Sequence, residues 1–180
     1  LMQKWLQEDK ASAFLKVLNN PYSPMGEVGD AIYRYAQFAA AGGTLAEPTR
    51  QGLQVSLVRR FLTEHLDFIK CAKEFFALPD FQALLGGMVM TESSRGRLGG
   101  KSAGLLLAHK IVSTMAAEEP LLAGIRVPKA AYVVSDWLLE FIDYNDLADV
   151  LEQKYKDVAQ VRREYPNIVQ LFKNSTFPAD

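Results

Sequence analysis

The sequence is poor in cysteine, in net charge and in long apolar runs, and each shortage excludes a class of protein. Cys71 is the single cysteine among 180 residues, so no internal disulfide can form. A net charge of −1 gives no bulk attraction to nucleic acid or to an anionic membrane surface. No uninterrupted apolar run approaches the roughly 20 residues that span a bilayer. We therefore expect neither a nucleic-acid partner nor a membrane partner.

The first residues also lack the pattern of a secretory signal. Leu1 to Trp5 are followed at once by charged residues, whereas a signal peptide continues into an apolar stretch. A single cysteine is compatible with a reducing compartment, so we expect a cytoplasmic protein. Hydrophobic residues make up 49% of the chain and charged residues 23%, which is typical of a globular protein with a buried core.

Residues suited to metal binding or covalent chemistry are few. His65 and His109 are the only histidines, and they fall on different predicted helices. Neither has cysteines or clustered acidic residues at the spacing of a metal site. Cys71 has no catalytic partner nearby in the sequence and is expected to be a small buried residue. We therefore predict no metal site and no catalytic residue in this chain.

Helical periodicity dominates the first 90 residues. Apolar residues recur three and four positions apart, which predicts helices that each bury one face. The first expected helix ends at Asn19, and others follow over residues 27–41, 49–77 and 81–85. Their short connections favour a small antiparallel helical bundle over residues 1–90.

The composition changes near Gly86. Six of the twelve glycines lie between residues 86 and 104, and we expect a second domain over residues 91–180. Its predicted elements are a helix from Lys101 or Ser102 to about residue 117, a strand over 130–134, a helix that Ser135 caps, and a helix from Asn145 or Asp146 that Pro166 ends. The expected fold class is mainly α with a small β component (α+β).

The stretch from Arg95 to Gly104 has the residue types of a phosphate-binding loop. Glycines allow backbone N–H groups to approach phosphate oxygens, because no Cβ stands in the way. The predicted helix directs its free N–H groups and its dipole toward the same anion. A lysine adds a mobile positive charge. The candidate phosphate-binding residues are Arg97, Gly99, Gly100, Lys101 and Ser102.

A Walker-type P-loop is one interpretation of this stretch. Gly100-Lys101-Ser102 fits the end of that motif, G-x-x-x-x-G-K-[ST]. Arg95, however, stands where the first glycine belongs. The residues before it are polar, whereas a P-loop follows a buried strand directly. We therefore reject a Walker motif.

Three segments of the second half together resemble the phosphoenolpyruvate synthase and pyruvate, phosphate dikinase family. Residues 96–105 resemble the glycine-glycine-lysine segment that opens the family's ATP-grasp-type, pyruvate/phosphoenolpyruvate-binding domain. Residues 125–135 resemble its second segment, in which a Val-Pro pair leads into a strand and a helix. Lys129-Ala130 replaces the Pro-Gly or Pro-Pro step usual there. Residues 172–178 resemble its Phe-Pro segment, so the resemblance covers about residues 95–180.

The resemblance implies an incomplete ATP-grasp-like fragment behind an N-terminal helical bundle. It implies that Lys101 contacts the phosphates of ATP, with the other four candidate residues beside it. ATP and Mg²⁺ would be the cofactors of the full-length enzyme, in which ATP phosphorylates a histidine and the phosphoryl group passes to pyruvate. A nucleotide and pyruvate or phosphoenolpyruvate would be its partners. The family's phosphohistidine lies in a separate later domain, so neither histidine of this chain is expected to have that role.

A helical protein-interaction or regulatory module without a nucleotide site is the alternative. The bundle would then dock a partner, and the glycine-rich stretch would be a linker. Under the leading hypothesis the 180-residue chain alone is inactive. The resemblance implies that the other residues that bind ATP and magnesium in this family would lie beyond Asp180. An incomplete domain would expose apolar surface, and a homodimer is expected to cover it.

Overall fold

The chain folds into a mainly helical structure with one small sheet, as expected from its sequence. The computed structural model describes residues 2–178, with the side chains of residue 9 and residues 11–178. It divides into two compact units, Leu1–Ser135 and Asp136–Asp180, which are described separately below. None of the helices among the described residues is long and apolar enough to cross a bilayer.

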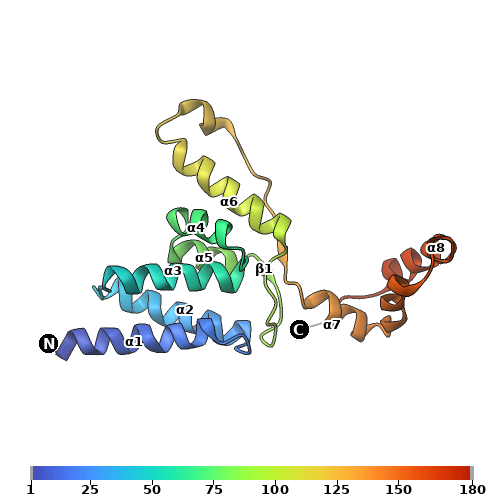
Figure 1. Cartoon of the computed structure of the whole chain (residues 1–180), viewed down its shortest axis with the longest axis horizontal. Coiled ribbons are helices and arrows are strands. Elements are labelled where there is room, and N and C mark those ends of the chain that lie inside the picture. Colours follow the sequence, from blue (N-terminus) through green and yellow to red (C-terminus); the bar gives the residue numbers. More distant parts are fainter. Residues whose placement is uncertain (1, 179–180) are drawn as a thin grey trace. The chain divides into compact units, whose positions relative to one another are not determined.

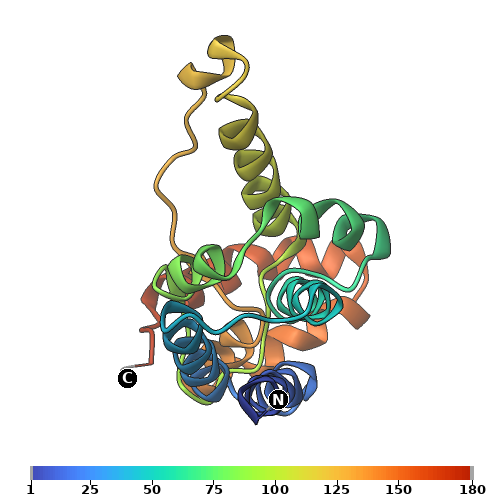
Figure 2. The same ribbon diagram turned by 90° about the vertical axis from the view of Figure 1, so that its left-hand side faces the viewer.

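Five helices form a bundle in the first unit (Figure 1). They are α1 (Met2–Asn19), α2 (Met25–Ala40), α3 (Glu47–Phe61), α4 (Leu66–Phe75) and α5 (Leu78–Leu85). Helix α1 packs against α2 and α3, which both contact α5, while α4 packs against α3. Figure 2 shows α1, α2 and α3 nearly end-on around their shared core. The largest fully buried side chains of this core are Phe61, Phe81, Met25, Ile32, Leu57 and Leu62.

Thr63 lies in the break between α3 and α4. Its hydroxyl accepts a hydrogen bond from the His65 N–H (3.1 Å), and its own N–H donates to the Val58 carbonyl (3.1 Å). Short polar side chains that bond to nearby backbone compete with helix hydrogen bonds. The prediction of a single helix over residues 49–77 is therefore wrong. The spacing of apolar residues continues through residue 63, but the local hydrogen bonds of Thr63 interrupt the helix there.

Cys71 lies on α4 and is exposed to solvent. The expectation that it is a buried residue is wrong. The buried residues of α4 are Ile69 and Ala72, and Cys71 lies on the exposed side of the helix with Lys70.

Helix α6 (Gly100–Met115) packs against α4 and is followed by the 3₁₀ helix η1 (Pro120–Gly124). The Lys110 ammonium lies 2.6 Å from the Asp80 carboxylate, which links α6 to α5. Strand β1 (Met88–Val89) pairs in parallel with β2 (Tyr132–Val133), with Met88 opposite Tyr132. The predicted strand is thus confirmed in a shorter form, whereas β1 was missed because two residues show no periodicity.

The second unit contains α7 (Trp137–Tyr144), the 3₁₀ helix η2 (Ala148–Tyr155) and α8 (Val158–Asn174). Its core is small. The buried residues Phe141, Ile142 and Leu147 pack with the partly buried Val150 and Phe172.

Asp146 ends α7 in a Schellman motif. It has a positive φ of 53°, its N–H donates to Asp143, and the N–H of Leu147 donates to Ile142 (2.8 Å). The Asn145 side chain donates to the Phe141 carbonyl. Asn145 and Asp146 were predicted to start a helix, and this is wrong because their bonds terminate the preceding one.

Pro166 lies inside α8 and does not break it. The Asp157 side chain caps the start of the helix by accepting from the Gln160 N–H (2.9 Å), and the Ser175 hydroxyl donates to the Leu171 carbonyl near its end. A proline removes one backbone bond from the ladder. Capped ends and further turns on both sides retain the helix, so the predicted break at Pro166 is wrong.

The domain boundary predicted near residue 91 lies within the first compact unit. The boundary was inferred from a change in composition and from the family resemblance. A division based on contacts between residues does not test either of these. The division into a bundle over residues 1–90 and a nucleotide-binding domain over residues 91–180 stays a prediction.

Candidate functional site

The candidate phosphate site is the N-terminal end of α6. Gly99 is the N-cap with φ −67° and ψ 154°, and its carbonyl accepts the first helical bond from the Ala103 N–H (3.0 Å). The N–H groups of Gly100, Lys101 and Ser102 precede that bond, so the helix itself does not satisfy them. A glycine cap has no side chain to cover them. The first turn therefore offers three backbone donors and the positive end of the helix dipole to an anion.

The two cap glycines and Lys101 are exposed, and Ser102 is partly buried. A Cβ built on Gly99 or Gly100 meets no atom within 4 Å. Neither glycine is among the described residues with positive φ. Backbone conformation and internal packing therefore do not require glycine here. A ligand that approaches the backbone from outside would require it.

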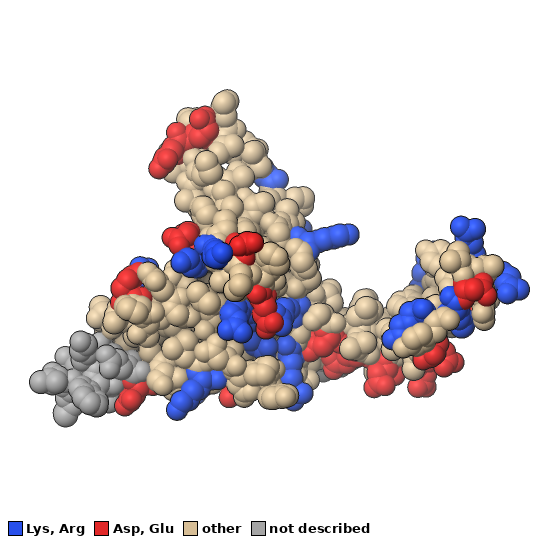
Figure 3. Space-filling model, in the orientation of Figure 1, with Lys and Arg blue, Asp and Glu red and all other residues tan. Residues whose placement is uncertain are grey.

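Arg97 is the one candidate residue with a charged partner inside the protein. Its guanidinium Nη2 lies 3.3 Å from the Glu64 carboxylate, and both side chains are substantially exposed. Figure 3 shows Lys and Arg side chains beside acidic ones near the end of α3, so this region is mixed in charge. A surface pair of this kind contributes little to stability.

Ser135 holds the backbone of Arg97 instead of capping a helix. Its hydroxyl accepts from the Arg97 N–H (3.3 Å), and its N–H donates to the Arg97 carbonyl (3.1 Å). The N-cap of α7 is Asp136, without a side-chain cap bond. The capping role predicted for Ser135 is therefore wrong. The residue instead joins two of the three segments on which the family resemblance rests, residues 96–105 and 125–135.

The loop before α6 is bound to the helical bundle. The N–H groups of Met25 and Gly26, at the start of α2, donate to the carbonyls of Ser94 (2.6 Å) and Glu92 (3.1 Å). The Leu98 N–H donates to the Phe61 carbonyl (2.9 Å), and the Leu98 side chain is buried in the core. The glycine N-cap of α6 thus follows directly after an anchored position.

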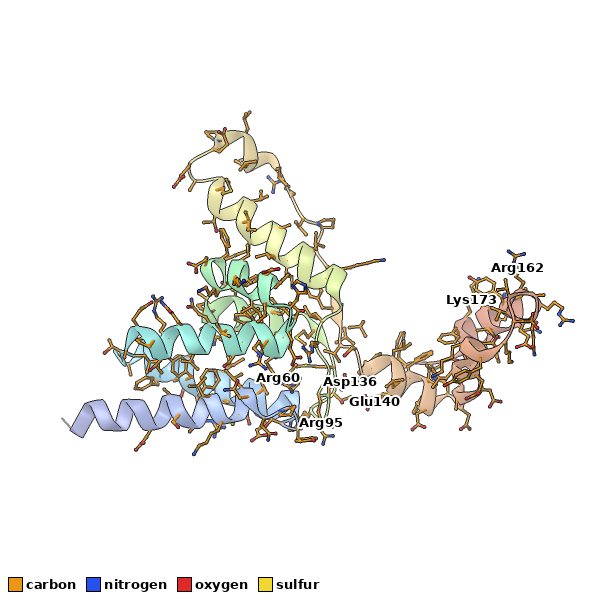
Figure 4. All side chains as sticks on the ribbon, viewed as in Figure 1. Arg60, Arg95, Asp136, Glu140, Arg162 and Lys173 are labelled. Carbon is orange, nitrogen blue, oxygen red and sulfur yellow. The ribbon has the colours of Figure 1, made fainter. Side chains whose placement is uncertain are left out.

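Arg59 and Arg60 are adjacent at the end of α3, but their side chains have different surroundings. Arg59 is exposed, whereas Arg60 is partly buried. Arg60 Nη2 donates to the Ser23 carbonyl (2.6 Å) and Nη1 to the Arg95 carbonyl (3.1 Å). Figure 4 shows Arg60 near the end of α3 and Arg95 in the adjoining loop. The sequence indicates this partial burial of Arg60, because residues three positions apart share a helix face and Arg60 follows the core residue Leu57 by three.

Metal-binding groups do not gather at this site. Across residues 2–178, no group of three or more His, Cys, Asp or Glu side chains could hold a metal ion. His65 precedes α4 as its N-cap, and His109 lies on α6, where Nδ1 is 3.5 Å from the Ser113 hydroxyl. The two histidines therefore lie on different elements.

An exposed helix start after a glycine-lysine segment is the kind of site at which proteins can bind phosphate groups. Residues 95–180 match the family model described as the pyruvate phosphate dikinase, AMP/ATP-binding domain. The resemblance inferred from the sequence is thus confirmed over residues 95–180. A search of curated proteins and a search of solved structures each found no match.

Proposed function

We propose that residues 95–180 are the ATP-binding N-terminal segment of a phosphoenolpyruvate synthase-like phosphotransferase. In the full protein, ATP would phosphorylate a histidine on another domain, and the phosphoryl group would pass to pyruvate. The observation that carries the proposal is the start of α6. Three backbone N–H groups without a helical acceptor lie there with the exposed Lys101, next to glycines that the fold itself does not require.

Each candidate residue has a distinct task in this proposal. The N–H groups of Gly100, Lys101 and Ser102 donate to phosphate oxygens, and the absence of side chains at Gly99 and Gly100 allows those oxygens to approach. The Lys101 ammonium adds a charge that follows the phosphates. Arg97 exchanges its Glu64 partner for a phosphate oxygen, because the exposed ion pair is weak and a guanidinium forms charge-assisted hydrogen bonds with phosphate.

Magnesium belongs to the full protein in this proposal. The described residues offer no cluster of carboxylates, which are the ligands that Mg²⁺ prefers. We propose that other parts of the full protein supply them, together with pyruvate binding. The segment alone is then inactive, and a cytoplasmic location and a homodimer remain part of the proposal.

A titration by nuclear magnetic resonance tests the phosphate site. ATP added to the ¹⁵N-labelled chain, up to millimolar concentration, is expected to shift the amide signals of Gly100, Lys101 and Ser102. Lys101→Ala is expected to weaken this binding by about tenfold to a hundredfold, since a charge-assisted hydrogen bond contributes about 1.5–3 kcal/mol.

Lys70→Ala is the matched control, because Lys70 is an exposed lysine of α4 paired with Asp67. It should bind ATP as the unaltered chain does. Equal affinity for Lys101→Ala would remove that lysine from the site. If ATP shifts no amide signal near the start of α6, that result would favour the alternative, a helical interaction module without a nucleotide site.

A further inference from the structure

Arg60 connects two segments that lie far apart in the sequence. Its guanidinium donates to the Ser23 carbonyl, just before α2, and to the Arg95 carbonyl, just before the glycine-lysine segment. Ser23 is only 2% exposed. A planar guanidinium with several donors suits such a bridge, because one side chain can satisfy two carbonyl groups at fixed angles.

The start of α2 binds the same loop from another side. The Met25 and Gly26 N–H groups donate to the carbonyls of Ser94 and Glu92, and the Ser94 side chain is buried. These contacts are close. A Cβ built on Gly26 would lie 3.2 Å from the Glu92 carbonyl oxygen and 3.3 Å from its Cβ. The loop therefore has little room to shift relative to α2.

These bonds determine where α6 begins. Phe61, the residue after Arg60, accepts from the Leu98 N–H, and Gly99 alone separates Leu98 from the first residue of α6. Consecutive residues at the end of α3 thus hold the loop at Arg95 and at Leu98. The backbone donors of the candidate site follow directly after these two anchors.

We propose that Arg60 is a positioning residue for the phosphate site, which makes the helical bundle a part of that site. This inference rests on the proposed function. Arg60 fixes the loop whose end sets the direction of the α6 N–H groups, and anion binding by such groups depends on their alignment. The bundle and the family segment then act together in binding phosphate, although the family match begins only at residue 95.

Arg60→Met tests the proposal with ATP and inorganic triphosphate as probes. The titration follows the Gly100, Lys101 and Ser102 amides at a temperature where circular dichroism shows a folded chain. We expect both dissociation constants to rise about threefold to tenfold, since misalignment weakens several hydrogen bonds without removing them. Arg59→Met removes the same charge from an exposed neighbour and should leave both constants unchanged. Arg60→Lys, which keeps the charge and one donor group, should recover part of the affinity.

Gly26→Ala tests the same contact without changing charge. Alanine favours a helix over glycine, so α2 should not lose stability, whereas the added methyl displaces the loop at Glu92. We expect weaker binding of both probes. Gly29→Ala is the control on the same helix, because its Cβ would meet only Leu85 Cδ1 at 4.0 Å.

The outcomes distinguish this inference from the proposed function. Wild-type affinity in Arg60→Met and Gly26→Ala, with weakened binding in Lys101→Ala, would overturn the positioning role and leave the proposed function standing. A lower melting temperature for Arg60→Met with unchanged affinity would show a structural role only, and this also overturns it. Wild-type affinity in Lys101→Ala would remove that lysine from the proposed site. Higher dissociation constants for Arg60→Met and Gly26→Ala would still support the positioning role in that case.

Discussion

Gly100 is a residue at which folding and binding are expected to favour different side chains. It is the first residue of α6, and a Cβ there meets no atom within 4 Å. Gly100→Ala should raise the free energy of unfolding by about 0.4–1 kcal/mol, because alanine loses less backbone entropy on folding. The same methyl would lie where phosphate oxygens approach, so ATP binding should weaken. Urea unfolding and the amide titration measure the two effects.

Gly104→Ala is the control for this prediction. Gly104 lies within α6, and its Cβ would also meet no atom within 4 Å. It should show the gain in stability without the loss of ATP binding. If Gly100→Ala binds ATP as tightly as the unaltered chain, the glycine at the helix start has no role in phosphate binding.

Single residues were predictable where their role depends on neighbours in the sequence. The glycine-lysine segment was expected at a helix start, and it lies there because capping and helix initiation are local. The bonds of Arg97 to Glu64 and Ser135 join residues 33 and 38 positions apart. The bridge that Arg60 forms is equally distant. Such pairs depend on how elements pack, which periodicity does not specify.

At the scale of elements, Glu164 joins α8 to the end of η2. Its carboxylate accepts from the Lys156 ammonium (2.6 Å) and from the Gln153 amide (2.7 Å). The hydrogen bond from Lys156, followed by that from Gln153, lowers the pKa of Glu164 from 4.5 to about 2. A carboxyl with a lowered pKa stabilises the folded state above its unfolded pKa, and this contribution is lost as the pH falls toward the folded value.

The second unit should therefore lose stability between about pH 4.5 and pH 2 through this residue. Glu164→Gln should reduce its stability at pH 7 and flatten the dependence on pH in this range. Hydrogen exchange of the α8 amides at pH 7, together with circular dichroism during acid titration, measures both effects. Glu152→Gln, at an exposed position of η2, is the control and should behave as the unaltered chain does. An acid transition unchanged by Glu164→Gln would contradict the prediction.

Helices were predicted well and their ends less well, for a physical reason. The apolar spacing that identifies a helix is repeated along it, so α2, α5 and α6 were expected near their observed positions. An end depends on one or two hydrogen bonds. Thr63 ends a helix whose apolar pattern continues, whereas Pro166 lies within a helix that it was expected to end.

At the scale of the whole molecule, the two units differ in the size of their cores. Among the described residues, the buried cluster of the first unit spans six helices, α1 to α6, whereas that of the second unit contains three residues. A core in so small a unit rarely provides more than about 3–5 kcal/mol. We expect the amide of Ile142, in α7, to exchange faster than that of Val58, in α3, when hydrogen exchange is measured under native conditions. Equal protection of the two amides would contradict this expectation.

The part of the site that the sequence could not predict also depends on the packing of the whole molecule. Resemblance identified residues 95–180 as family-like, and composition suggested a separate bundle before them. The contact of that bundle with the loop at residues 92–98 depends on the packing of α2 and α3, which no local pattern contains. The mainly helical fold class was predictable, because apolar residues recur at helical spacing along most of the chain.

The exposed thiol of Cys71 makes this chain suitable for spectroscopy without prior engineering. As the only cysteine, it reacts with a maleimide fluorophore or a spin label at a single position. It lies on α4, the helix that packs against α6. A probe attached there would report on the environment of α6 when a nucleotide is added, with no second label to separate and no native cysteine to remove.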